Sequence, residues 1–128
     1  MEKKAIQTVA APSAIGPYSQ GIRCGTLLFV SGQIPLNPKT GELVKGSIED
    51  ETHQVLTNLR AVIEEGGSSF KDVLRTTIFL TDLNHFARVN EIYATYFSAP
   101  FPARVTIQVS GLPKGAQVEI DAIANVIP

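Results

Sequence analysis

The stretch from Phe101 to Ala122, FPARVTIQVSGLPKGAQVEIDA, decides the expected fold. Apolar and polar side chains alternate in its first half, the apolar ones being Val105, Ile107 and Val109. A period of two is typical of a strand with one buried face. Pro113 and Gly115 then favour a turn, and the alternation resumes from Val118 onward. The stretch therefore predicts two strands that pair as a hairpin.

A hairpin that is symmetric about this turn sets Arg104 opposite Asp121 and Thr106 opposite Glu119. This register keeps both apolar sets on one face of the sheet. Arg104 and Glu119 then lie diagonally on the polar face, with backbones roughly 7–8 Å apart. Two interpretations stay open. The pair is an exposed cross-strand ion pair worth roughly 0–1 kcal/mol, or its guanidinium and carboxylate share a ligand pocket.

Length and composition indicate one globular domain spanning residues 1–128. Hydrophobic residues make up 44% of the chain and charged residues 18%, which is ordinary for a packed domain. The net charge is −1 and no block of Lys or Arg occurs, so nucleic acid is not an expected partner. The apolar runs are far shorter than the ~20 residues that a membrane-spanning helix needs, so no membrane association is expected.

The few cysteine and histidine residues indicate a reducing setting and no metal. Cys24 is the single cysteine, so an intrachain disulfide is impossible. The first residues lack the apolar segment of a signal peptide, and we therefore expect a cytoplasmic protein. Cys24, His53 and His85 are far apart in the sequence and do not have the spacing of metal ligands.

Outward from the deciding stretch, the chain alternates strands and helices. Strands are expected over residues 3–9 and 73–80, and a hairpin over 22–31 with its corner at Cys24 and Gly25. In the strand 73–80, Leu74, Ile78 and Leu80 are expected to form an apolar side, on which Thr76 is the polar exception. The Gly-Pro turn at residues 16–17 delivers Tyr18 to a strand start. Gly32, at the exit of the hairpin, either lets a ligand approach closely or forms a simple bulge.

Two helices are expected between these strands. Ser47 is the N-cap of the first, with Asp50 in the capping-box position, and the helix ends at Gly66. His53 lies off its apolar stripe and is expected to face solvent. Thr81 or Asp82 caps the second helix. The apolar stripes are Val55, Leu56, Leu59, Val62 and Ile63 in the first helix, and Phe86, Val89, Tyr93, Tyr96 and Phe97 in the second.

The order β-ββ-α-β-α-ββ predicts an α+β fold in which two helices cover one face of a mixed sheet. The opposite face is then exposed or buried against another subunit. Several apolar residues are expected on it, and oligomerisation is the simplest way to keep them from water. These residues are Leu28 or Phe29, Phe79, Ile123 and Ile127.

Several blocks of the chain, in order, resemble the RidA/YjgF family of small enamine/imine deaminases. As a set they are specific, and they run nearly from end to end. The blocks are Ala14–Gln20, Ser31–Pro35, Leu83–Phe86 with Val89-Asn90, Phe101–Arg104, and Leu112–Gly115 with Val118–Ile120.

This resemblance implies a chorismate mutase-like fold that forms a homotrimer, with a central β-barrel and with sites in clefts between subunits. It also implies hydrolysis of 2-aminoacrylate and 2-aminocrotonate, or of their imine tautomers, to 2-oxo acids and ammonia. No metal or organic cofactor is implied, because an imine is already electrophilic.

The resemblance also assigns roles to residues. Arg104 would grip the substrate carboxylate bidentately, and Glu119 would act as general base and acid on a water molecule. The backbone of Ser31 and Gly32 would lie against the ligand. Tyr18 and Asn90 match positions that line the cleft. Many members read Arg-Ser-Cys where this chain reads Arg104-Val105-Thr106, so that Thr106 places a hydroxyl beside the ligand in place of a thiol.

Three alternatives to the deaminase stay open from the sequence. The first is a non-catalytic regulatory trimer that binds a 2-oxo acid or an amino acid through Arg104. The second is an endoribonuclease or translation inhibitor, against which the lack of a basic stripe and of a histidine pair argues. The third is a protein-binding accessory module.

Overall fold

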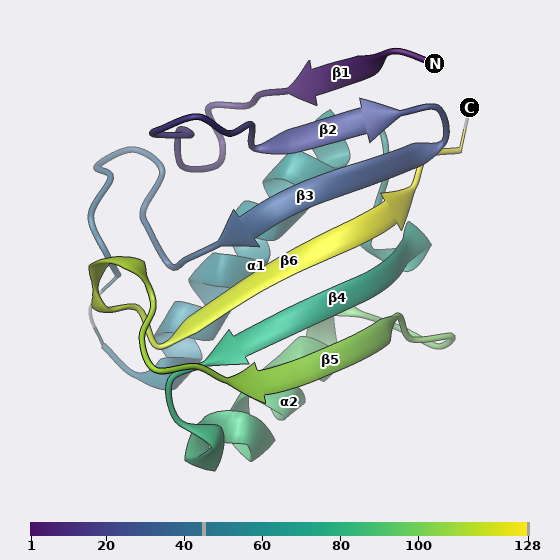
Figure 1. Cartoon of the computed structure of the whole chain (residues 1–128). Helices are drawn as coiled ribbons and strands as arrows, with labels where there is room; N and C mark the ends of the chain where they lie inside the picture. Colours follow the sequence, from purple (N-terminus) through teal and green to yellow (C-terminus); the bar gives the residue numbers. More distant parts are fainter. Residues whose placement is uncertain (45, 128) are drawn as a thin grey trace.

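The computed structural model describes residues 1–44 and 46–127, and its six strands form one mixed sheet (Figure 1). The strand order is β1-β2-β3-β6-β4-β5. Neighbouring strands are antiparallel except β4 and β5, which are parallel. The strands are β1 (Lys3–Ile6), β2 (Gly21–Cys24), β3 (Leu27–Gln33), β4 (Val73–Leu80), β5 (Ala103–Gln108) and β6 (Val118–Asn125).

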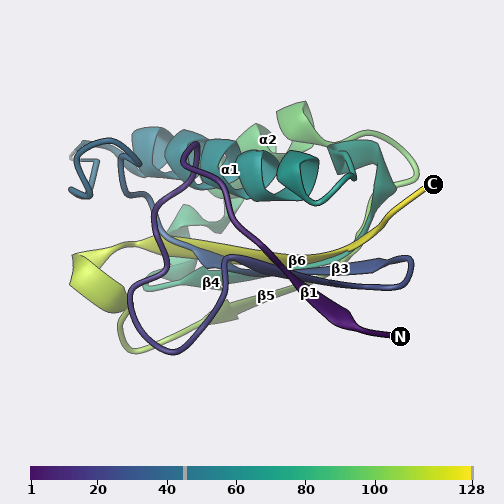
Figure 2. The ribbon, with the colours of Figure 1, turned by 90° about the horizontal axis from the view of Figure 1, so that it is seen from above.

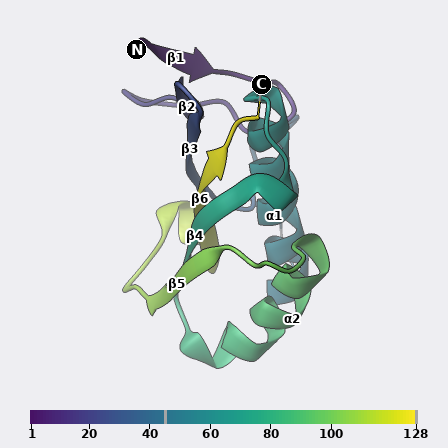
Figure 3. The same cartoon turned by 90° about the vertical axis from the view of Figure 1, so that its right-hand side faces the viewer.

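Two helices cover one face of this sheet and leave the other face bare, as Figures 2 and 3 show from two directions. They are α1 (Ile48–Glu65) and α2 (Phe86–Tyr96), so the predicted element order is confirmed. Ser47 caps α1, its side chain accepting a hydrogen bond from the backbone N–H of Asp50. The predicted stripe of α1 is fully buried against the sheet. Short 3₁₀ turns span Phe70–Asp72, Leu83–His85 and Pro113–Gly115.

The predicted hairpin of the last two strands is wrong. β4 lies between β5 and β6, and the Cα partner of Arg104 is Thr76 rather than Asp121. Because β5 follows the crossover through α2, it pairs in parallel with β4 at the sheet edge. The segment between β5 and β6 then passes β4, so that β6 pairs with β4 on one side and with β3 on the other.

The orientation of β5 is also the reverse of the expected one. Arg104 and Thr106 point toward the helices, because their Cα partners Thr76 and Ile78 are buried beneath them. Val105 and Ile107 therefore point to the bare face, where they are 38% and 40% exposed. The alternation was read correctly, but the polar set occupies the helix-covered side.

The bare face carries an apolar patch that spans the sheet. Phe29 is 43% exposed on it, whereas Leu28, its alternative in the prediction, is fully buried under the helices. We call this set the open-face patch. Its members are Leu27, Phe29, Phe79, Val105, Ile107 and Ile123. Ile127, which was expected on this face, is exposed beyond the end of β6.

Smaller differences concern strand ends. Leu74 was expected on the same side as Ile78 and Leu80, but it is 49% exposed, because the pairing with β6 is irregular between Val73 and Arg75. Thr76 does lie on that side and is buried. Tyr18 lies in the loop before β2 rather than at its first residue. Asp82 caps the 3₁₀ turn that leads into α2, accepting from the N–H of Asn84.

Neither helix is long and apolar enough to cross a membrane. Within residues 1–44 and 46–127, no three side chains of His, Cys, Asp or Glu gather in a way that could hold a metal ion.

Candidate functional site

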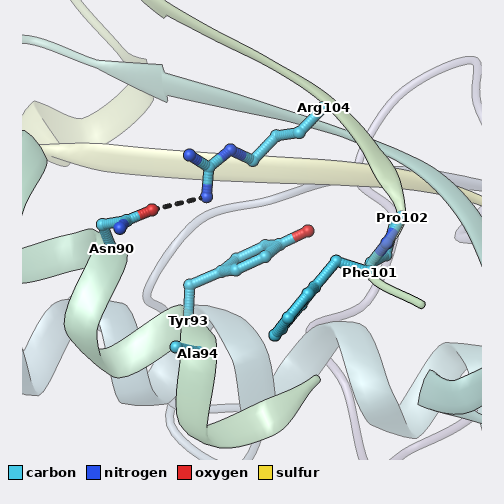
Figure 4. Close-up of a pocket in the computed structure, with 6 residues that line it drawn as sticks. All are labelled: Asn90, Tyr93, Ala94, Phe101, Pro102 and Arg104. Atoms are coloured by element: carbon cyan, nitrogen blue, oxygen red, sulfur yellow. Dashed lines mark hydrogen bonds between the residues drawn. The ribbon is translucent and has the colours of Figure 1, made fainter. Parts of the chain in front are cut away.

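Arg104 lines a cavity of about 420 Å³ between β5 and α2 (Figure 4). Its side chain extends from β5 over the ring of Tyr93. Asn90, which lies one helical turn before Tyr93 in α2, faces the guanidinium. Ala94, Phe101 and Pro102 complete the lining. We call this cavity the arginine pocket.

The guanidinium of Arg104 is held by neutral groups. One terminal nitrogen donates to Oδ1 of Asn90 at 2.7 Å. The guanidinium carbon lies 5.0 Å from the ring centroid of Tyr93 and 5.7 Å from that of Phe86, within range of cation–π attraction. In the described residues both salt bridges belong to Arg88. The guanidinium therefore keeps donors free for an anion.

Tyr93 supports Arg104 from beneath as a neutral phenol. Burial raises the pKa of its hydroxyl, since a phenolate is poorly solvated there. The hydroxyl shares a 2.7 Å hydrogen bond with Oγ1 of Thr76. Thr106 follows Arg104 on the same side of β5, where its Oγ1 is buried and has no hydrogen-bond partner among the described residues.

Glu119 lines a second and larger cavity of about 660 Å³, which we call the glutamate pocket. Tyr18, Ser31 and Gly32, three of the predicted site residues, also line it. The remaining lining residues are Pro12, Ser13, Ile15, Gln20, Gln33, Ile34, Leu36, Pro113 and Lys114. Most of the wall is apolar, and the carboxylate of Glu119 is its acidic group.

The carboxyl group of Glu119 has a raised pKa. Partial burial is the main cause because it penalises the charged form, and the negative charge of Asp121 adds to it. A carboxyl group whose pKa is shifted toward neutrality can both accept and return a proton. This property suits a general base that later acts as an acid.

Gly32 lets the Glu119 side chain lie directly on β3. A Cβ atom at residue 32 would come within 2.9 Å of Cδ of Glu119 and would overlap the carboxylate. The register of β3 against β6 shifts between Val30 and Gln33, so Ser31 and Gly32 form a bulge there. The bulge interpretation of Gly32 is therefore confirmed. The close contact at Gly32 is with the side chain of Glu119, and the approach of a ligand stays a prediction.

The predicted site residues divide between these two pockets. Arg104 and Asn90 lie on the helix-covered side, with Thr106 next along that side of β5. Glu119 points to the other side, since its neighbours Val118 and Ile120 are buried beneath the helices. The expected diagonal of Arg104 and Glu119 within one chain is thus wrong.

Sequence reasoning missed two aromatic partners of Arg104. Phe86 and Tyr93 were assigned to the apolar core stripe of the second helix. Their spacing from Asn90, four residues before and three after, places all three on one helical face. That spacing was the available signal. His53 is exposed as predicted, with Nδ1 2.7 Å from the hydroxyl of Tyr96.

Known proteins share this architecture over almost the whole chain. Residues 8–126 match the family described as Endoribonuclease L-PSP. A solved structure from Yersinia pestis, described as a protein of the conserved Rid family, has a TM-score of 0.95 and 53% identity, and covers 98% of this chain and 100% of its own. The 2-iminobutanoate/2-iminopropanoate deaminase of Mus musculus is 47% identical over 95% of this chain and 90% of its own.

A third relative was solved with a small molecule. Escherichia coli TdcF with bound serine has a TM-score of 0.91 and 41% identity, and the alignment covers 97% of this chain and 99% of TdcF. The named deaminase and the amino-acid complex show that the family includes imine deaminases and binders of small molecules. From the family match and these identities, the chain belongs to the RidA/YjgF family, whose family description is Endoribonuclease L-PSP.

Proposed function

We propose that this protein is an enamine/imine deaminase that hydrolyses 2-aminoacrylate and 2-aminocrotonate, through their imine tautomers, to 2-oxo acids and ammonia. The observation that carries the proposal is the division of the site into an arginine pocket and a glutamate pocket. One supplies a guanidinium with no acidic partner, and the other supplies a carboxyl group with a raised pKa.

The two pockets complement each other across a subunit boundary. Arg104 and Glu119 face opposite sides of one sheet, so a single substrate cannot reach both in one chain. A homotrimer with a chorismate mutase-like arrangement would place the arginine pocket of one subunit against the glutamate pocket of the next. Burial of the open-face patch would drive such an assembly, since its apolar residues are half-exposed in the single chain.

The chemistry follows from the two groups. Arg104 binds the substrate carboxylate through paired hydrogen bonds. Glu119 takes a proton from a water molecule, whose oxygen bonds to the imine carbon. Glu119 returns that proton to the nitrogen and then transfers the proton of the new hydroxyl group to it as well, so that the C–N bond breaks and ammonia leaves as the C=O bond forms. The water supplies the oxygen and the hydrogens, so no oxidant or reductant is required.

The remaining candidate residues line the path of the substrate. Asn90 aims the guanidinium, while Tyr18, Ser31 and Gly32 form the wall beside Glu119. The unpartnered hydroxyl of Thr106 is available to the ligand or to a water molecule beside Arg104. A hydroxyl at this position predicts substrate preferences that differ from those of members with a thiol.

A coupled assay tests the activity. A serine or threonine dehydratase generates the enamine in place, and semicarbazide competes to trap the imine. Wild-type protein should accelerate release of the 2-oxo acid and reduce trapping, whereas Arg104→Ala and Glu119→Gln should do neither. If wild-type protein leaves both rates unchanged, the deaminase proposal fails.

A mixing experiment tests the shared site. Arg104→Ala and Glu119→Gln trimers are unfolded together and refolded, so that subunits exchange. About one site in four should then contain both unmodified residues, because each site takes one residue from each of two subunits. Recovery of about that fraction of wild-type activity supports the shared site. No recovery from a fully refolded mixture contradicts it.

A regulatory binding protein is the second candidate, because TdcF, a relative, was solved with serine bound. In that case Arg104 would hold a 2-oxo acid or an amino acid without turnover. Wild-type turnover in the coupled assay separates the two functions, since it is expected only in the deaminase, whereas calorimetric titration of Glu119→Gln with 2-oxobutanoate should show binding in both. An endoribonuclease is less favoured by the net charge of −1.

A further inference from the structure

Irregular backbone forms much of the wall of the glutamate pocket. Three such segments contribute: the loop between β1 and β2, the segment that follows β3, and the turn before β6. We call them wall A (residues 8–19), wall B (residues 34–36) and wall C (residues 113–117). A segment outside helices and strands is positioned only by its own contacts. Each wall has one such contact with a buried polar side chain.

Gln20 holds wall A. Its side chain is almost fully buried, and Oε1 accepts from the N–H of Thr8 at 2.7 Å. Nε2 donates to three carbonyl oxygens, at 3.0 Å for Thr8, 3.3 Å for Ala11 and 2.7 Å for Pro12. Ala11 is the one residue of wall A in the apolar core, and Val9 and Ile15 are 94% and 81% exposed. The side-chain amide of Gln20 therefore fixes the first part of the loop between β1 and β2, and Tyr18 lies in the later part of the same loop.

Asn58 holds wall B from the middle of α1. It is fully buried, and Nδ2 donates to the carbonyl oxygens of Ile34 at 3.2 Å and Leu36 at 2.9 Å. Its Oδ1 accepts from Nε2 of Gln54, one helical turn earlier, at 2.8 Å. The helix thereby fixes the backbone of both wall residues.

Glu51 holds wall C from the first part of α1. Its buried carboxylate accepts from the backbone N–H of Gln117 at 2.9 Å and from Nε2 of the same residue at 2.6 Å. Gln117 lies two residues before Glu119 and directly after the turn that contains Lys114. The N–H of Thr81 donates to the carbonyl oxygen of Gln117 at 3.1 Å, so this residue is fixed to the helix layer and to the chain that follows β4.

We propose that Gln20, Asn58 and Glu51 are positioning residues that together set the shape of the glutamate pocket. None of them is needed to explain the chemistry, and Asn58 and Glu51 are not among the residues that line the cavity. A buried side chain that hydrogen-bonds to the backbone of an irregular segment orders that segment, and its loss leaves buried carbonyl or N–H groups without partners. The consequence for binding rests on the proposed function, whereas the consequence for local order does not.

Three apolar variants test the proposal. Gln20→Met, Asn58→Leu and Glu51→Leu replace each polar side chain with an apolar one and remove its hydrogen bonds. Thr52→Val is the matched control. Thr52 is also fully buried in α1, but its hydroxyl donates to the carbonyl oxygen of Ile48 within the helix rather than to a wall.

The first readout is amide hydrogen exchange of the folded protein. Each variant should speed exchange about tenfold or more in its own wall, while the interior of α1 is unchanged and Thr52→Val leaves all three walls as in the wild type. Equal acceleration throughout the chain, or acceleration of the walls in Thr52→Val as well, would overturn the proposal.

The second readout separates positioning from general damage. In the coupled assay, the KM should rise about fivefold or more while kcat changes less than about threefold, because Glu119 and Arg104 are retained. Affinity for 2-oxobutanoate should fall in parallel. A loosened wall with unchanged KM and unchanged affinity contradicts a role in the pocket. If the wild type shows no turnover, the proposed function fails, and exchange and 2-oxobutanoate titration still decide the proposal.

Discussion

Arg104 illustrates how a charge can be positioned without being neutralised. Two aromatic faces and one amide oxygen hold the guanidinium, and none of these groups carries a negative charge. A carboxylate partner would compete with the carboxylate of a substrate. Neutral support therefore keeps the arginine ordered and available, which favours a binding role over a structural ion pair.

Replacement of Arg104 by Lys should raise the KM about tenfold or more, which corresponds to about 1.4 kcal/mol of lost binding. A lysine keeps the charge but loses the planar fork and the stacking on Tyr93. Steady-state kinetics in the coupled assay measure the change, with Arg88→Lys on the exposed side of α2 as the control. An unchanged KM in Arg104→Lys would show that the fork is not used.

Glu119→Gln should stabilise the folded protein at neutral pH and not at pH 4. The pKa of Glu119 is raised mainly by burial, so the folded state binds the proton more tightly than the unfolded state. Stability is therefore lost as the pH rises from the ordinary glutamate pKa through the raised one, and glutamine avoids this loss. Thermal unfolding at both pH values provides the measurement.

Glu49→Gln is the control of opposite sign. Hydrogen bonding to Arg88 lowers the pKa of Glu49, so this carboxylate stabilises the folded state at neutral pH, an effect that fades as the pH falls through the lowered pKa. Its replacement should slightly lower the melting temperature at neutral pH. A fall of similar size in Glu119→Gln would contradict the assigned sign.

At the scale of elements, local patterns predicted the order and approximate position of each helix and strand, but not how the last strands pair. The first strand ends at Ile6 rather than at residue 9, and the second helix begins at Phe86, after the 3₁₀ turn that Asp82 caps. The cap at Ser47, the apolar stripe of α1 and the alternation in β5 and β6 are local, and each is confirmed. Strand pairing is not local. The same alternation suits a hairpin or two strands separated by β4, and the choice depends on the crossover through α2.

The candidate site was predicted in parts for the same reason. Family motifs identified residues of both pockets, and the structure brings Tyr18, Ser31 and Gly32 together with Glu119, and Asn90 together with Arg104. The division of these groups between two faces depends on the pairing of β5, which the pattern could not resolve. The supports from α1, Asn58 and Glu51, carry no local signal because their partners lie far away in sequence.

Gly32→Ala should greatly reduce activity with little loss of stability. The added Cβ would overlap the Glu119 carboxylate and push it from its place on β3. The coupled assay and the melting temperature measure the two effects. Gly111→Ala is the matched control, since a Cβ there has no atom within 4 Å. Full activity in Gly32→Ala would mean that the position of this carboxylate is not critical.

At the scale of the whole molecule, the bare face of the sheet is the surface through which we propose that the chain assembles. Ile107→Lys should convert an oligomer into monomers, because a buried charge in the middle of the open-face patch cannot be solvated. Light scattering after size-exclusion chromatography gives the mass. Val9→Lys is the control, since Val9 is 94% exposed outside the sheet. A mass unchanged in Ile107→Lys would exclude this face as the interface.

The position of β6 has a consequence for synthesis on the ribosome. It is the last of the six strands in the sequence, yet it lies in the interior of the sheet, bonded to β3 on one side and β4 on the other. While β6 is still inside the exit tunnel, β3 and β4 each present an unpaired edge, and such edges are prone to pair with other chains. Until β6 emerges, the strands already synthesised therefore cannot close the sheet.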